Sequence, residues 1–328
     1  MTKVQHVTIT ESPAIPPTFT FVPSSVGPVY TGPTSTTCNK FVGDATLGTA
    51  TAQDNCPGVV VTRSGVPTGN TFPVGVTTIT YTATDRSGNT NTTPATQTVT
   101  VVDNTPPVIT CPADFLNVPT EPGTCAAHVT VGTATATDNC DTNPTIVGTR
   151  SDGRPLTDTY PRGTTTITWT ATDHANPANQ SSCIQTLTVV DTEPPVIVLN
   201  GQTPEMWPPN HKYHTFQVTD FVTAVTDNCD SISVGSVSIT KVTSDEIENG
   251  NGDGNTLNDI VIAADCKSVQ LRSEREGGGN GRVYTIFFSV SDTSGNVGTA
   301  TAKVIVRHNP GETAVDSGVH YTVLSNCP

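Results

Sequence analysis

The order of hydrophobic and polar residues is strand-like through most of the chain. In the runs TTITYTATD (77–85) and QTVTVVD (97–103), β-branched or aromatic residues alternate with polar ones. A period of two places every second side chain on the same face of a strand, so that one face is buried. Turn-forming sequences such as Pro-Val-Gly, Ser-Gly-Asn and Asp-Asn-Cys separate the runs. The pattern predicts an all-β chain of short strands joined by turns.

Two long stretches of the sequence occur twice. Gly48–Cys56, GTATAQDNC, returns as GTATATDNC at Gly132–Cys140, and Phe72–Asn89 returns as Tyr160–Asn179. Matches of this length at similar offsets indicate a structural repeat of slightly under about 90 residues. Short strands with turn signals about every 10 residues, in a unit of this size, predict an immunoglobulin-like β-sandwich. We therefore expect tandem sandwich modules.

Three modules fit the length of the chain. A chain of 328 residues suits about three domains of roughly 100 residues each. The last part keeps the motifs VTDNC and SVSDTSGN with longer insertions between them, so the third module is a divergent relative. The expected organisation is an N-terminal extension strand at 1–15, module 1 at 16–104, module 2 at 105–192, and module 3 with an extra C-terminal strand at 193–328.

Composition narrows the functional class. The chain is 34% hydrophobic and 13% charged, and its 29 acidic against 15 basic residues give a net charge of −14. This charge repels nucleic acid and anionic lipid and attracts divalent cations. No stretch approaches the roughly 20 apolar residues of a membrane span, and Met1–Ser12 has no signal-peptide pattern. Nine cysteines without zinc-ribbon spacing favour disulfide bonds and an extracytoplasmic location.

The motifs of module 2 resemble a known family. PPVITCP, PGTC, DNC, YPRGTTTITWTATD and SSCIQTLTVVD follow one another as in the hyalin-repeat (HYR) family. The resemblance implies an immunoglobulin-like fold, a role in extracellular adhesion or surface architecture, and no catalytic residues. Module 1 matches from Pro16 onward but lacks two of the four cysteines. Pro204–His214 is similar to a WPPNH-containing segment of C-terminal modules in bacterial surface and secreted proteins, so we expect a bacterial protein that is extracellular or at the cell surface.

Comparison of the two copies predicts the disulfide bonds. Cys111 and Cys183 have no counterpart in module 1, whereas the other two cysteines of module 2 are present in both copies. Four cysteines allow three connectivities, and the joint absence of two favours a bond between those two. The expected bonds are Cys38–Cys56, Cys111–Cys183, Cys125–Cys140 and Cys229–Cys266. Cys327 is left over, either as a free thiol or for an intermolecular bond.

Aspartates recur at strand ends and near the module boundaries. They are Asp54, Asp85, Asp103, Asp138, Asp173, Asp191, Asp227 and Asp292. Ca²⁺ prefers six to eight oxygen ligands, so carboxylates from loops at one end of a sandwich would share an ion and stiffen the linker. Alternatively, each aspartate caps its own turn through a hydrogen bond to the backbone.

A second candidate for calcium lies in module 3. The segment DEIENGNGDGNTLND (245–259) places carboxylates and amides among glycines, and its candidate ligands are Asn249, Asn251, Asp253 and Asp259. Ile260 stands where an EF-hand requires a bidentate Glu, so an ordinary acidic hairpin loop is the alternative. We expect no required cofactor, with Ca²⁺ as the one candidate ion.

The two ends of the chain suggest self-assembly. HVTITESPAIPP, before module 1, reads like the closing strand of a preceding module, and Gly318–Pro328 reads like one more strand after module 3. Strand addition between subunits would involve Val7, Ile9 and Val323, and would produce a head-to-tail polymer. Truncation and disorder are the alternatives for the first segment.

The sequence contains no GxSxG elbow and no HExxH helix, and we expect no enzyme activity. The predicted function is a subunit of a cell-surface stalk or filament that associates with copies of itself. The alternative is a calcium-stabilised adhesin or binding appendage, whose partners would be surface proteins or glycans.

Overall fold

The computed structural model describes residues 15–327. The chain forms two compact units, each of which contains part of module 2. The first comprises Met1–Asp114, Val131–Leu156 and Thr166–Gln185, and the second comprises Phe115–Thr130, Thr157–Thr165 and Thr186–Pro328. The boundary region between modules 1 and 2, which we name the first junction, lies in the first unit. The boundary region between modules 2 and 3, the second junction, lies in the second unit.

Module 1 is built from eight strands and two short helical elements. Its main sheet has the order β2-β8-β7-β5, in which β2 is parallel to β8 and the other neighbours are antiparallel. Two strand pairs, β1-β4 and β3-β6, complete the module. The elements are β1 (Thr18–Phe21), β2 (Val26–Tyr30), β3 (Asn39–Phe41), α1 (Asp44–Leu47), β4 (Thr51–Gln53), β5 (Val60–Ser64), η1 (Thr68–Asn70), β6 (Thr71–Pro73), β7 (Gly75–Thr84) and β8 (Ala95–Val102).

Module 2 repeats this arrangement strand by strand. Its main sheet is β10-β16-β15-β13, again with a parallel first pair, and its strand pairs are β9-β12 and β11-β14. The elements are β9 (Val108–Thr110), β10 (Phe115–Pro119), β11 (Ala126–Ala127), β12 (Thr135–Thr137), β13 (Thr145–Arg150), β14 (Tyr160–Pro161), β15 (Gly163–Thr172) and β16 (Gln180–Val190).

Module 3 keeps the same plan with larger sheets. The main sheet has the order β18-β25-β24-β21-β26, a second sheet is β19-β23-β22, and β17 pairs with β20. The elements are β17 (Val196–Leu199), β18 (Glu205–Met206), β19 (Tyr213–Gln217), η2 (Val218–Asp220), β20 (Val222–Thr226), η3 (Val234–Ser236), β21 (Ser238–Ser244), β22 (Ile260–Ile262), β23 (Ser268–Arg272), β24 (Arg282–Ser291), β25 (Val297–Val306) and β26 (Tyr321–Leu324).

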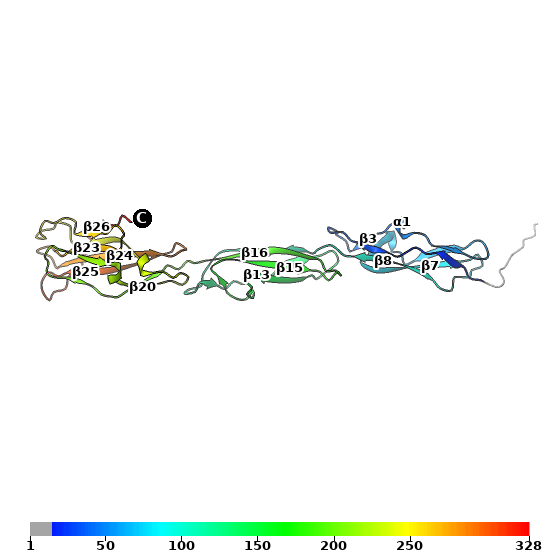
Figure 1. Ribbon diagram of the computed structural model, residues 1–328, viewed down its shortest axis with the longest axis horizontal. Helices are drawn as coiled ribbons and strands as arrows, with labels where there is room; N and C mark the ends of the chain where they lie inside the picture. The colour runs from blue at the N-terminus through cyan, green and yellow to red at the C-terminus, as the bar shows by residue number, and fades with distance from the viewer. Residues whose placement is uncertain (1–14, 328) are drawn as a thin grey trace, which may run out of the picture. The chain divides into compact units, whose positions relative to one another are not determined.

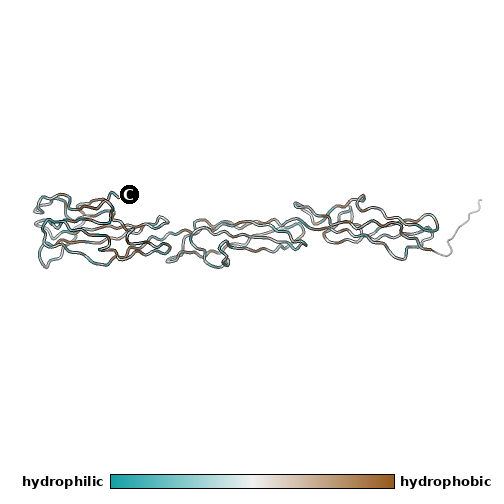
Figure 2. Tube along the Cα trace, in the orientation of Figure 1, coloured by the Kyte–Doolittle hydropathy of each residue, from teal (hydrophilic) through white to brown (hydrophobic). Residues whose placement is uncertain are grey.

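The long strands near the end of each module carry the alternation seen in the sequence. Along β7, and again along β15 and β24, buried and partly exposed residues alternate. Figure 1 labels β7 and β8 in module 1 and the equivalent β24 and β25 in module 3. Figure 2 shows hydrophobic and hydrophilic positions interspersed along the coloured part of the chain. The prediction of an all-β chain of immunoglobulin-like sandwiches stabilised by disulfide bonds is confirmed.

One buried polar pair recurs in the cores of modules 1 and 2. The Tyr81 hydroxyl donates to Gln97 Oε1 at 2.7 Å, and Trp169 Nε1 donates to Gln185 Oε1 at 3.1 Å. The amide of each glutamine then donates to backbone carbonyls, which in module 1 include Leu47 O at 3.0 Å. A buried polar group costs little when it is paired in this way. Trp169 therefore has a structural role in its core.

The structure describes only one of the two chain ends predicted to take part in assembly. Val7 and Ile9, predicted for assembly, lie outside the described residues. Val323 lies in β26, where it pairs with Val242 of β21 inside module 3. β26 is an edge strand of the main sheet of module 3, next to β21, and the part of Val323 in assembly stays a prediction. A disulfide bond between Cys327 and Cys266 also ties the segment to module 3.

Candidate cation sites and disulfide bonds at the module junctions

The turn with the sequence Asp-Asn-Cys supplies the first acid of each junction. Asp138 Oδ1 accepts hydrogen bonds from the backbone N–H groups of Cys140 at 2.9 Å and Asp141 at 2.8 Å. Asp227 Oδ1 accepts the two equivalent bonds in module 3, at 2.9 and 2.7 Å. In both turns the second oxygen, Oδ2, is buried and has no hydrogen-bond partner. One oxygen thus holds the turn, and the other is left for a ligand.

The hairpin between the two longest strands of the module, β15 and β16 in module 2 and β24 and β25 in module 3, supplies the second acid. Asp173 Oδ1 accepts from the backbone of Asn179 at 2.7 Å, and its Oδ2 accepts from the side chain of the same residue at 2.7 Å. Asp292 and Asn296 form the same pair of bonds in module 3, at 2.8 and 2.7 Å. The Asn179 side chain also donates to the carbonyl of Asp103 at 3.4 Å. The hairpin is thereby connected to the linker of the preceding module.

The linker supplies the third acid, directly after the last strand of the preceding module. Asp103 Oδ1 accepts from Thr31 Oγ1 at 3.0 Å and from the backbone of Thr105 at 3.1 Å. Asp191 Oδ1 accepts from the backbone of Glu193 at 3.1 Å. These two aspartates are only 3% and 5% exposed, and in each the Oδ2 atom is buried without a hydrogen-bond partner. A buried carboxylate oxygen without a partner is costly unless a cation or a proton neutralises it.

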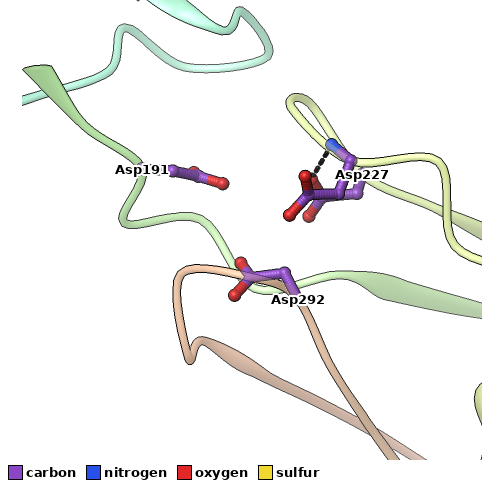
Figure 3. A group of neighbouring side chains, drawn as sticks. Asp191, Asp227 and Asp292 are labelled. Atoms are coloured by element: carbon purple, nitrogen blue, oxygen red, sulfur yellow. Dashed lines mark hydrogen bonds between the residues drawn. The ribbon is translucent and has the colours of Figure 1, made fainter. Parts of the chain in front are cut away.

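The three acids of each junction converge. Ligand oxygens of Asp103, Asp138 and Asp173 lie within 4.8 Å of one another, as do those of Asp191, Asp227, Asp230 and Asp292. Figure 3 shows the carboxylates of Asp191, Asp227 and Asp292 directed toward one another from three separate segments of the chain. Carboxylate oxygens at such spacing suit a hard cation such as Ca²⁺. The same geometry therefore occurs at both junctions.

The second junction also contains an arginine that the sequence had not singled out. Arg162 Nη2 lies 3.0 Å from Asp230 Oδ1, and Arg162 Nη1 lies 3.9 Å from Asp191 Oδ2. Hydrogen bonds from the Thr293 side chain and backbone, followed by the bond from Arg162, lower the pKa of Asp230 to about 2. Asp230 is therefore engaged with these partners, and three acids remain for a cation, as in the first junction.

The first junction is arranged differently at these positions. In the repeat alignment Val74 takes the place of Arg162, so no guanidinium is supplied there. Asp141, the counterpart of Asp230, lies 2.7 Å from His174 Nδ1. Hydrogen bonding to the backbone N–H of Asn143, and then to His174, lowers the pKa of Asp141. The three junction acids of this cluster thus face one another without an arginine beside them.

A disulfide bond links the modules at each junction. Cys38 is bonded to Cys140, with the Cα atoms 4.8 Å apart, and Cys125 is bonded to Cys229, with the Cα atoms 4.7 Å apart. In both cases the second cysteine belongs to the Asp-Asn-Cys turn. The asparagine of that turn donates to the carbonyl of the residue before the first cysteine, at 3.0 and 2.8 Å. The turn that holds a junction acid is therefore fixed covalently to the preceding module.

These bonds differ from the pairing expected within modules. The structure contains Cys111–Cys183, but it does not contain Cys38–Cys56, Cys125–Cys140 or Cys229–Cys266. Cys56 is free, and Cys327 is bonded. The pairing within module 2 does not occur because Cys140 meets the preceding module, whereas Cys125 meets the following one. The repeat alignment identified the equivalent cysteines but left open whether partners lie in one module or in neighbours.

The predicted calcium loop of module 3 forms a buried ionic cluster instead of an EF-hand-like loop. Asp253 and Asp259 meet Glu274, which the sequence prediction had missed, within 4.8 Å. The backbone carbonyl of Asn251 accepts a hydrogen bond from Gly277 N at 3.0 Å, and Asn249 adopts a left-handed backbone conformation with φ 60°. Of the four predicted ligands, Asp253 and Asp259 are thus brought together in an acidic cluster.

Arg282 already supplies a positive charge inside this cluster. Its Nη1 lies 2.5 Å from Asp259 Oδ2, and its Nε lies 3.0 Å from Glu246 Oε2. Burial, and then a hydrogen bond with Glu274, raises the pKa of Asp259 to about 6. Because the guanidinium lies among these carboxylates, the cluster is explained as a buried ion-pair network. The junctions are therefore the stronger candidates for a metal ion.

Comparison with known proteins matches this repeat to a family. The HYR domain profile matches residues 15–101 and 102–189, which together make up just over half of the chain. The chain belongs to the HYR domain family. The match does not extend to module 3, so the similarity of Pro204–His214 to WPPNH-containing modules stays a prediction.

Two relatives named hyalin come from sea urchins. One from Strongylocentrotus purpuratus is 36% identical over 187 residues, covering 54% of this chain and 15% of the relative. One from Lytechinus variegatus is 36% identical over 183 residues, covering 52% of this chain and 32% of the relative. The chain thus spans less than a third of the length of either protein. Neither relative supports the expected bacterial source.

Cadherin ectodomains are among the solved structures that match the chain. Protocadherin Gamma B2 domains 1–5 match with a TM-score of 0.40 and 15% identity, over 89% of this chain and 60% of that chain. Mouse Cadherin-23 EC22–24 matches with a TM-score of 0.35 and 16% identity, over 88% of this chain and 98% of that chain. In the part of the chain that the structure describes, no helix is long and apolar enough to cross a membrane.

Proposed function

We propose that this HYR protein is an extracellular structural protein of the adhesion type, a spacer whose successive modules are held together by disulfide bonds and by Ca²⁺ at the junctions. The observation that carries the proposal is the repetition of one arrangement at two places. At each junction a linker aspartate, a turn aspartate and a hairpin aspartate converge beside an intermodular disulfide bond. Such a cluster resists relative movement of neighbouring modules once a cation binds the three acids together.

The chemistry of the donors favours a hard divalent cation. Each junction presents only oxygen ligands, and two of its three acids have a buried Oδ2 atom without a hydrogen-bond partner. Carboxylates this close repel one another in the absence of a cation. Oxygen-only sites suit Ca²⁺, which takes several carboxylate, carbonyl and water oxygens in flexible geometry. The excess of acidic residues in the whole chain also favours cations near the protein.

The disulfide bonds favour a location outside the cytosol, and the roles of the acidic residues favour a function other than catalysis. Eight of the nine cysteines are in disulfide bonds, which persist in oxidising compartments outside the cytosol. The relatives named hyalin match about half of this chain, and they support an extracellular role. The acids gathered at the junctions are used by turns and by a candidate ion, and we infer that the protein is not an enzyme.

Assembly into a filament remains a further part of this proposal. It would require residues 1–15, with Val7 and Ile9, to add a strand to another subunit. The alternative function is an adhesin that binds glycans or surface proteins through its exposed loops. Imaging of the purified protein by negative stain separates the two, because deletion of 1–15 would abolish fibres formed by strand addition and would leave a monomeric adhesin unchanged.

Calorimetric titration with Ca²⁺ tests the main proposal. We expect two binding events per chain, one of which is lost in Asp103→Asn and the other in Asp191→Asn. Asparagine keeps the acceptor oxygen that holds each linker, and its NH2 group replaces the second carboxylate oxygen, so that the charge and one possible cation ligand are lost. Asp265→Asn is the matched control, since Asp265 also caps its own turn, at 3.0 Å from the backbone N of Lys267, but lies outside both clusters. Absence of binding to the native chain would reject the calcium proposal.

A further inference from the structure

Module 1 carries the same Asp-Asn-Cys turn as the modules that follow it. Cys56 occupies the position of Cys140 and Cys229 in the repeat. Both of these are bonded to a cysteine of the preceding module. Cys56, in contrast, is a free and partly buried thiol. The position that is cross-linked twice in this chain is therefore present a third time without its partner.

The residues around Cys56 match the junction surfaces of modules 2 and 3. Asp54 Oδ2 accepts from the backbone N of Cys56 at 3.1 Å, and its Oδ1 is buried without a hydrogen-bond partner. Asp85, the hairpin acid, is 7% exposed, and its Oδ1 accepts from the backbone N of Asn89 at 2.8 Å. Its Oδ2 accepts from the Asn89 side chain at 2.7 Å, as in the other two hairpins. We name Asp54, Asn55, Cys56 and Asp85 the Cys56 face.

We infer that the Cys56 face is a docking surface for the carboxyl-terminal end of another HYR module and forms a disulfide bond with it. The two internal junctions define what this partner must carry. It needs a cysteine equivalent to Cys38 and Cys125, a backbone carbonyl before that cysteine to accept from the Asn55 amide, and an aspartate after its last strand.

The partner must be a module other than the three in this chain. In modules 1 and 2, the cysteine that bonds to the Asp-Asn-Cys turn of the next module is Cys38 or Cys125. Both of these are already in disulfide bonds. In module 3 the two cysteines that remain are bonded to each other. A further HYR module with an unpaired cysteine at the position of Cys38 and Cys125 meets these requirements, and a glycan or a small ligand does not.

The bond forms by thiol–disulfide exchange. The partner cysteine arrives as a mixed disulfide with a small thiol of the glutathione type. The Cys56 thiolate, having lost its proton to solvent, attacks the sulfur of the partner cysteine. The new intermodular S–S bond forms as the old one breaks, and the small thiol leaves as a thiolate that takes up a proton. No further oxidant is needed.

A chain with one added module tests the inference. In it, residues 105–193 precede residues 16–328, so that an extra copy of module 2 leads into module 1 through its own linker. We expect peptide mapping to find a Cys56–Cys125 bond, which is absent from the native chain. Labelling of Cys56 by iodoacetamide should fall from complete to background.

Two matched variants make the result specific. Cys125→Ser in the added copy should restore labelling of Cys56, and Cys56→Ser should leave the added Cys125 reactive. If Cys56 stays reactive while the added copy has formed its Cys111–Cys183 bond, the module is folded and the inference is overturned. Dimers linked through two Cys56 residues would overturn it as well. The readouts are a disulfide bond and a thiol label, so they can be obtained in chelator, and failure of this inference is distinguishable from failure of the proposed cation sites.

Discussion

Replacement of Asp138 by asparagine should change the stability of module 2 in opposite directions with and without calcium. Asp138 Oδ1 accepts two backbone hydrogen bonds that an amide oxygen also accepts, so the turn is kept. One carboxylate oxygen of Asp138 lies within 4.8 Å of a carboxylate oxygen of each of the other two acids. At that separation two charges repel by about 1 kcal/mol in water and about 3 kcal/mol at an effective dielectric constant near 20.

In chelator the Asp138→Asn protein should therefore be more stable than the native protein, by about 1 to 2 kcal/mol after solvent screening. At a Ca²⁺ concentration of 100 times Kd, the native site gains about 2.7 kcal/mol, which the variant loses. The difference in the free energy of unfolding should then reverse and favour the native protein by about 1 kcal/mol.

Fluorescence-detected urea unfolding measures this difference. Trp169 is 3% exposed in the core of module 2, and a Trp207→Phe background removes the signal of the other, 43% exposed tryptophan. Asp138→Ala provides the comparison, because it also loses the turn bonds and should be destabilised in both conditions. An equal effect of Asp138→Asn in chelator and in calcium would show that this carboxylate takes no part in cation binding.

Three further predictions concern stability. Arg282→Met should lower the free energy of unfolding of module 3 by about 3 to 5 kcal/mol in calorimetry, because it leaves Asp259 and Glu246 buried without their cation; unchanged stability would contradict the ion-pair interpretation. The pKa of Asp259 is raised from 3.8 to about 6, so its folded state holds a proton more tightly than the unfolded state. The contribution of Asp259 to the free energy of unfolding of module 3 should be greatest below about pH 4 and should fall as the pH rises to about 6. Asp259→Asn should flatten that part of the pH profile. Removal of the second intermodular bond by Cys125→Ser with Cys229→Ser opens a loop with a sequence separation of 104 residues and should cost up to about 4.7 kcal/mol in denaturant unfolding; an effect near zero would contradict the loop-entropy argument.

The candidate site was visible in the sequence only in part. Asp103, Asp138 and Asp173 were identifiable because they recur at strand ends in a repeated pattern. Whether each capped its own turn or joined an ion site was open, and the structure assigns the two roles to different oxygens of the turn acid. Arg162 gave no comparable signal, because its counterpart in module 1 is Val74 and a single arginine in a loop has many explanations.

The sequence by itself determined the all-β class, the sandwich modules and the family. These follow from the period of two in TTITYTATD and from repeated turns, both of which are local properties of the chain. Only the tertiary structure decided the partners of the cysteines and the use of the last strand. Cys140 bonds to Cys38, which is 102 residues away, and β26 returns to β21. Such pairings depend on which ends of the sandwiches meet. Local sequence patterns carry no information about contacts between residues so far apart in the chain.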